Sequence, residues 1–194
     1  TQGYSSAASD VYKRQLLFIV LIANTLSVQA QDVFMKGDNL IGAKIGIGNG
    51  LATSTTYENC IVDGLFRNGN GAIGIGGYLG YAHDKVEISE RGITVGCKYN
   101  DIIIGVQGNL HIQFVDRLDT YAGAMLGYEI VNTKNYGRSN DPNFDYSHFI
   151  NVDGSGMTFS LHLGARYYLT DNLAANIELG YGVAFANLGL SYRF

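Results

Sequence analysis

Apolar and polar residues alternate with a period of two through most of the chain after residue 38. In 159–169 the odd-numbered positions hold Phe, Leu, Leu, Ala, Tyr and Leu, whereas the even-numbered positions hold Ser, His, Gly, Arg and Tyr. The segments 104–114 and 173–181 divide in the same way, and helical spacing fits none of them. Because successive side chains of a β-strand point to opposite faces, this period predicts strands with one apolar and one semi-polar face.

Eight segments of this kind follow one another along the chain. Most are joined by short turns, and two are joined by long connections. The long connections, 84–100 and 133–156, lie at one end of the expected sheet, so the other end is plain. Such a run of strands joined in sequence predicts an all-β fold built as an antiparallel up-and-down meander. The predicted strands are 39–48, 53–63, 71–83, 101–115, 119–132, 157–169, 173–182 and 185–194.

The polar face of these strands is poor in charge. A soluble β-sandwich or lipocalin-like barrel, the alternative fold, would present many Lys, Glu and Asp residues to water. Here that face is mostly Gly, Ser, Asn and Gln, and only 15% of the chain is charged. We therefore interpret the apolar face as lipid-facing and the semi-polar face as enclosed, which predicts an eight-stranded transmembrane β-barrel. The expected aromatic girdles comprise Tyr81, Tyr121, Tyr128, Tyr167, Tyr181, Tyr192 and Phe194.

One short apolar run lies near the start of the chain. The sequence LLFIVLIA at 16–23 follows two basic residues and precedes small or apolar residues at Val28 and Ala30. This pattern is typical of a secretory signal, and it predicts cleavage between Ala30 and Gln31. A buried helix of a cytosolic domain is the alternative, but it would leave the flanking charges and the cleavage-like site unexplained.

The first fifteen residues do not fit that signal. The stretch from Asp10 to Gln15 looks like a translated sequencing-adapter tail, so we take 1–15 as an artefact. Residues 16–30 are then the remainder of a signal peptide, and 31–194 form the expected barrel domain.

The chain ends on a pattern of its own. Asn187, Gly189, Tyr192 and the terminal Phe194 match the C-terminal insertion signal of bacterial outer-membrane barrels. With these residues, 31–194 as a whole resembles the OmpA/OmpX-like family of small eight-stranded barrels. The segments 76–81, 119–123 and 164–168 look like the variant common in Bacteroides-type bacteria.

That resemblance implies a location and partners. It implies a monomer in the outer membrane of a Gram-negative bacterium, inserted by the barrel-assembly machinery and surrounded by outer-membrane lipid. A net charge of -4 argues against a nucleic-acid partner, and no residue spacing indicates a cofactor or a metal ion. The family therefore indicates where the protein lies more firmly than what it does.

The enclosed face is expected to carry a balanced set of charges. An eight-stranded barrel is just wide enough for side chains to fill it, so enclosed charges must pair. We expect Lys44 to pair with Glu58 and Arg166 with Glu178, with inward glycines leaving them room. This network either fills the barrel or gates a narrow, low-conductance pore. Its expected members are Lys44, Arg166, Arg193, Glu58, Glu129 and Glu178, with His111 and His162 nearby.

A catalytic interpretation of the same face is weaker. Ser160 and His162 lie two positions apart, and Glu129 on the preceding strand could complete a hydrolase-like set. A lipid-modifying enzyme is therefore an alternative, but the residues form no recognisable motif and we expect no enzymatic activity. Cys60 and Cys97 fall toward opposite ends of the barrel, which favours free thiols over a disulfide.

The two long connections are the remaining functional candidates. Both 84–100 and 133–156 mix charged residues with polar or aromatic ones. Loops on a rigid scaffold commonly carry binding, although these could equally be solvated tips. The sequence therefore predicts an integral outer-membrane protein with a structural role, or with an adhesive role toward a host or cell-surface ligand at these loops.

Overall fold

The computed structural model describes residues 34–48, 50–90, 93–138 and 154–194. The predicted artefact 1–15, the signal remainder 16–30 and the Ala30–Gln31 cleavage point lie outside these residues. No helix in the described part of the chain is long and apolar enough to span a membrane.

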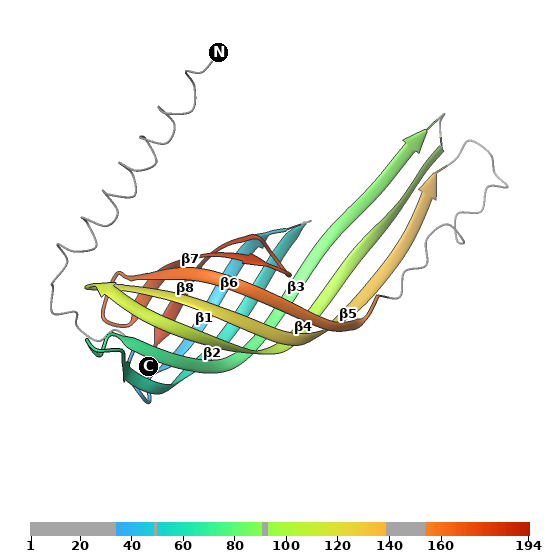
Figure 1. The fold of residues 1–194 in the computed structure, drawn as a ribbon. Helices are drawn as coiled ribbons and strands as arrows, with labels where there is room; N and C mark the ends of the chain where they lie inside the picture. Colours follow the sequence, from blue (N-terminus) through green and yellow to red (C-terminus); the bar gives the residue numbers. More distant parts are fainter. Residues whose placement is uncertain (1–33, 49, 91–92, 139–153) are drawn as a thin grey trace, which may run out of the picture.

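Eight strands close into a barrel in which each strand is antiparallel to the next (Figure 1). The last strand also pairs with the first, with Ile41 opposite Tyr192, so the barrel has no open edge. Closure satisfies the backbone hydrogen-bonding groups that lipid cannot. The strands are β1 (Asn39–Ile47), β2 (Leu51–Leu65), β3 (Gly71–Glu90), β4 (Ile93–Val115), β5 (Leu118–Arg138), β6 (Gly156–Tyr168), β7 (Leu173–Tyr181) and β8 (Ala186–Arg193).

The predicted two faces are confirmed, and their polarity is the reverse of a soluble protein's. Outward side chains are large and apolar, as at Val106 and Leu163, each 65% exposed. Inward side chains are polar, as at Gln107 and Asn109 on β4, which are 5% and 3% exposed. An apolar exterior around a polar interior is the arrangement of a transmembrane β-barrel.

Six of the seven residues predicted for the aromatic girdles are exposed on the outer face, and Tyr121 is the exception. Tyr121 is only 4% exposed because it lies on the same side of β5 as Met125, which also faces the interior. Its ring therefore belongs to the interior and not to the membrane interface.

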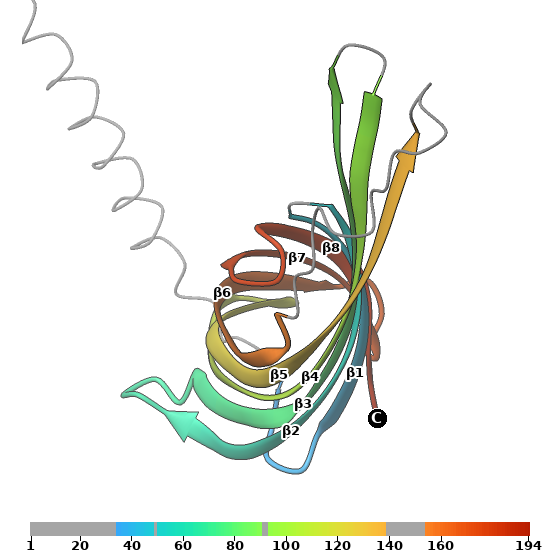
Figure 2. The same cartoon turned by 90° about the vertical axis from the view of Figure 1, so that its right-hand side faces the viewer.

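The prediction that 84–100 is a loop is wrong. Strands β3 and β4 stay paired from Tyr81 opposite Ile102 as far as Glu90 opposite Ile93. Strand β5 pairs with β4 as far as Arg138, so 133–138 is also strand, and 139–153 lies outside the described residues. Figures 1 and 2 show these three strands rising well past the rest of the barrel. We call β3 84–90, β4 93–100 and β5 131–138 the strand extension.

The polarity of the extension explains why it resembled a loop. Alternation continues, but the outward positions are now Lys85, Lys98 and Lys134, whereas inward positions include Val86 and Ile88. An outward face that meets water needs polar side chains, so the apolar-outward pattern stops where lipid stops.

A charge on the lipid-facing surface should destabilise the barrel only where lipid touches it. Leu126→Arg places a cation in the middle of the outward apolar positions of β5, and we expect a loss of about 2–4 kcal/mol in the free energy of unfolding in lipid vesicles. Asn132→Arg, outward on the same strand beyond the apolar band, should cost about 0–1 kcal/mol. Urea titration of both variants in vesicles measures the difference, and equal losses would contradict the lipid-facing assignment.

Candidate functional site

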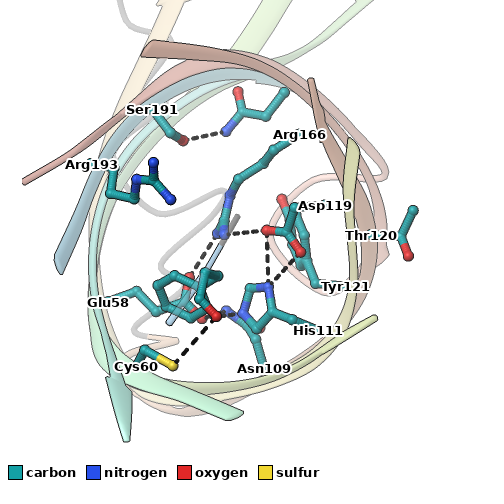
Figure 3. Close-up of polar contacts among 12 residues, drawn as sticks. Glu58, Cys60, Asn109, His111, Asp119, Thr120, Tyr121, Arg166, Ser191 and Arg193 are labelled. Atoms are coloured by element: carbon teal, nitrogen blue, oxygen red, sulfur yellow. Dashed lines mark hydrogen bonds and ion pairs between the residues drawn. The ribbon is translucent and has the colours of Figure 1, made fainter. Parts of the chain in front are cut away.

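A cluster of charged side chains fills the half of the barrel near the short turns, with Arg166 at its centre (Figure 3). The Arg166 guanidinium is 4% exposed and lies between two carboxylates from different strands. Its Nη2 donates to Glu58 Oε2 at 2.7 Å and its Nη1 to Asp119 Oδ2 at 3.1 Å. Glu58 and Asp119 are each 1% exposed, so all three charges are removed from solvent and depend on one another.

His111 joins the same two carboxylates from the opposite side. Its Nε2 lies 2.8 Å from Glu58 Oε1 and its Nδ1 lies 2.9 Å from Asp119 Oδ1. A carboxylate only accepts hydrogen bonds, so an imidazolium that donates from both nitrogens satisfies both contacts. Asn109 Nδ2 donates a further bond to Glu58 Oε1 at 2.8 Å. Two cations therefore face two anions in this cluster.

A second ion pair lies nearer the centre of the barrel. Lys44 Nζ lies 2.8 Å from Glu178 Oε2, although Lys44 is on β1, Glu178 is on β7 and β8 runs between them. Gly189 is the β8 residue opposite Lys44, and a Cβ there would come within 2.7 Å of Lys44 Cγ. The Lys44 side chain therefore crosses β8 where there is no side chain to obstruct it. Asn187 Nδ2 also donates to Glu178, at 3.4 Å.

Tyr121 connects the two ion clusters. Its hydroxyl donates to Glu178 Oε2 at 3.0 Å. The Arg166 guanidinium carbon lies 4.3 Å from the centre of its ring, which is within the range of a cation–π interaction. The interior thus holds one continuous network in which three cations balance three anions.

The sequence predicted the wrong partners for these charges. Lys44 does not pair with Glu58, because Lys44 lies opposite Ser54, which is four residues away from Glu58 on β2. Arg166 does not pair with Glu178, because its direct neighbour on β5 is Asp119. Glu58 instead reaches Arg166 across the interior, and a cross-barrel contact of this kind follows from barrel closure and not from local spacing.

Two predicted members of the network lie outside it. Glu129 lines the cavity at the mouth of the barrel near the strand extension, and the buried side chains of Ile103 and Met125 lie between it and the ion clusters. Arg193 lies at the opposite rim, where its Nη1 is 3.5 Å from Asp38 Oδ2 and its Nη2 donates to the Asp171 carbonyl. His111 and Asp119 take their places in the charge balance.

Asp119 could have been found from the sequence. It is an odd-numbered residue of β5, as are Tyr121, Gly123 and Glu129. Alternation along the strand therefore places its side chain on the same inward face. Its place next to a turn concealed this. Gly74, Gly123 and Gly164, predicted to make room, do so: a Cβ at these positions would clash with Glu58, with Asn109 and with Tyr121.

The network leaves almost no empty space at the centre of the barrel. A cavity of about 140 Å³ lies beside Asp119 and Phe34 near the short turns, and one of about 360 Å³ lies at the mouth beside Glu129. Between them, beside Lys44 and Glu178, only about 10 Å³ is open. That volume is at the lower limit for a single water molecule, so the described interior is closed.

The hydrolase-like set is not assembled. Glu129 lies opposite Gly156, four residues along β6 from Ser160. His162 Nε2 instead contacts Asn109 Oδ1 at 2.7 Å. Cys60 and Cys97 are both buried free thiols. Among the described residues, no group of His, Cys, Asp or Glu is arranged to hold a metal ion.

The strand extension contains an ordered cluster on its outer face. Tyr136 of β5 crosses the middle strand at Gly96, where a Cβ would collide with the ring, and its hydroxyl donates to Glu87 Oε2 at 2.8 Å. Lys85 forms an ion pair with the same carboxylate. Hydrogen bonding from Lys85 and then from Tyr136 holds the pKa of the Glu87 carboxyl below its usual range, and Glu87 in turn raises the pKa of Lys85.

The predicted C-terminal signal lies on β8 and the residue after it, with its members on both faces. Asn187 and Gly189 face the interior network, whereas Tyr192 and Phe194 are exposed on the outside. The interior pair therefore has a structural role in addition to the insertion role, which stays a prediction.

Comparison with known proteins returns structures but no sequence family. The chain matches no protein-family model and no curated protein. Its structure is similar to the N-terminal β-barrel domain of Pseudomonas aeruginosa OprF, with 17% identity, a TM-score of 0.44 and coverage of 82% of this chain and 98% of that one. It is also similar to Ail, the attachment invasion locus protein of Yersinia pestis, in complex with the heparin analogue sucrose octasulfate. For Ail the identity is 14%, the TM-score 0.43 and the coverage 82% of this chain and 100% of that one.

Removal of the central cation should destabilise the barrel strongly. Arg166→Met leaves Glu58 and Asp119 facing each other with only His111 between them, and we expect a loss of about 3–5 kcal/mol in the free energy of unfolding. Arg193→Met, which breaks a longer ion pair at the rim, should cost about 1 kcal/mol or less. Urea unfolding in lipid vesicles compares the two, and a loss for Arg166→Met no larger than for Arg193→Met would show that the network is dispensable.

Proposed function

We propose that this protein is an integral barrel of the bacterial outer membrane that holds a three-stranded platform, the strand extension, at the cell surface. The barrel serves as a closed anchor, and the extension makes contacts with surfaces outside the cell. The resemblance to the OmpA/OmpX-like family in its Bacteroides-type form supports the outer membrane as the location. The C-terminal residues from Asn187 to Phe194 support insertion through the barrel-assembly machinery.

One observation carries this proposal: the extension exposes apolar side chains on a part of the molecule that lies beyond the lipid-facing band. Val86 is 45% exposed, Ile88 62% and Ile93 37%, and Val95 lies beside Ile88 on the same face. An exposed apolar group of this kind is typical of an interaction surface. Continuous strand pairing from the barrel supports it, so the surface is presented on a rigid element.

The closed interior argues for an anchor over the gated pore. A conducting path would have to pass the space of about 10 Å³ beside the Lys44–Glu178 ion pair, and then the cluster around Arg166. Opening it would separate buried ion pairs, which is costly. The lipid-modifying alternative lacks support for a different reason, since Ser160 and Glu129 are four residues out of register.

Conductance distinguishes the anchor from the pore. The refolded protein in a planar bilayer should show no discrete openings, and Glu129→Gln should be equally silent because Glu129 lies outside the ion network. Lys44→Ala, which removes the cation beside the narrowest point, is the variant with the best chance of opening a leak. Discrete wild-type openings that Lys44→Ala alters would replace the anchor proposal with the pore.

The contact role predicts a loss on shortening the extension. Residues 86–97 can be replaced by Asn-Gly, which supports a two-residue hairpin turn between the paired Lys85 and Lys98. Fluorescent vesicles carrying this variant should bind cultured epithelial cells at least about tenfold less than vesicles with the wild-type protein. Heat-modifiable migration on gels confirms that both barrels are folded, and undiminished binding by the shortened form would refute the contact role.

A further inference from the structure

The strand register places three lysines side by side on the outer face of the extension. Lys85 of β3 lies directly opposite Lys98 of β4, and Lys98 lies directly opposite Lys134 of β5. Adjacent strands are about 4.8 Å apart, so the three side chains start within about 10 Å. All three residues are exposed. We call them the lysine row.

The row is only partly neutralised by the protein around it. Lys85 pairs with Glu87, but in the described part of the chain no ion pair joins Lys98 or Lys134 to a carboxylate. Like charges directly opposite each other in a sheet destabilise it. The Tyr136 ring lies 5.4 Å from Lys85 Nζ and 5.6 Å from Lys98 Nζ, which holds both ammonium groups in place without cancelling their charge. The row therefore carries a fixed excess of positive charge.

The register also gives the height of the row above the lipid. The last apolar outward row is Tyr81, Ile102 and Ile130, and the next outward row is His83, Asn100 and Asn132. The lysine row follows, four residues beyond the apolar one. At about 3.3 Å per residue and a strand tilt of about 40°, that places it about 10 Å above the hydrocarbon edge. Lipid headgroups extend about 5–8 Å beyond that edge. The backbone of the row therefore lies just above the headgroups, and long lysine side chains can reach down to them.

We infer that the lysine row binds phosphate groups on the headgroups of outer-leaflet lipid. Phosphates supply the anions that the row lacks, and the lipid brings them to the outer surface of β3, β4 and β5 at the required height. A soluble polyanion would not need the row to lie next to the apolar band. This inference rests on the proposed membrane location, but not on the contact role of the extension tip.

The test uses the full chain folded in uncharged detergent micelles, with bisphosphorylated lipid A as the probe. Native mass spectrometry measures how much lipid A each barrel retains. Lys98→Gln with Lys134→Gln should weaken the apparent affinity about 30-fold at low salt. The matched control, Lys36→Gln with Arg67→Gln, removes the same charge from exposed residues near the short turns and should stay within about twofold of wild type.

Two further probes separate the sources of the anion. Lipid A lacking one phosphate should bind more weakly to the wild type and lose less on removal of the two lysines. Inorganic phosphate and heparin should compete poorly with lipid A. Equal loss in the lysine pair and the control, or heparin that binds the row more tightly than lipid A, would overturn the inference.

The lysine row and the tip of the extension can be tested separately. Replacement of 86–97 leaves all three lysines in place, so loss of cell binding with retained lipid A affects only the inferred role of the tip. Failure to fold in lipid vesicles, by contrast, would remove the membrane proposal itself.

Discussion

The enclosed charges must neutralise one another, and the rest of the structure accommodates that requirement. An eight-stranded barrel encloses too little space for water to solvate them, so Arg166 and His111 must meet Glu58 and Asp119 directly. Inward glycines such as Gly74, Gly164 and Gly189 follow from the same need, since a side chain there would occupy the space of Glu58, Tyr121 or Lys44. The network joins strands that do not pair with one another, and it therefore stabilises the closed ring as well as filling it.

One structural device appears twice, inside the barrel and outside it. Lys44 reaches the next strand but one by crossing Gly189, and Tyr136 reaches Glu87 by crossing Gly96. In both cases a glycine on the middle strand lets a long side chain lie flat across the sheet. Glycine normally weakens a strand. At these two positions it also allows a contact between strands that are not neighbours. The extension is thereby braced beyond the point where the barrel itself supports it.

The same strands pass through two environments, and their outer face changes accordingly. Up to the row of Tyr81, Ile102 and Ile130 it is apolar, and beyond it the face becomes polar and then basic. The inner face changes in the opposite sense, from charged inside the barrel to apolar at Val86 and Ile88. With the interior closed, both changes direct attention to the extension as the part of the protein that meets other molecules.

Alternation along the sequence determined the number of strands, their order, the faces they present and most of the inward residues. These are local properties, because a period of two assigns each side chain to a face without reference to any other strand. The tertiary structure alone decided which charges meet. Glu58 finds Arg166 only because closure brings β2 and β6 to face each other, and Lys44 finds Glu178 only because Gly189 lies between them. It also decided that 84–90 and 93–100 are strand, because pairing with a neighbouring strand, and not the polarity of their residues, holds these segments extended.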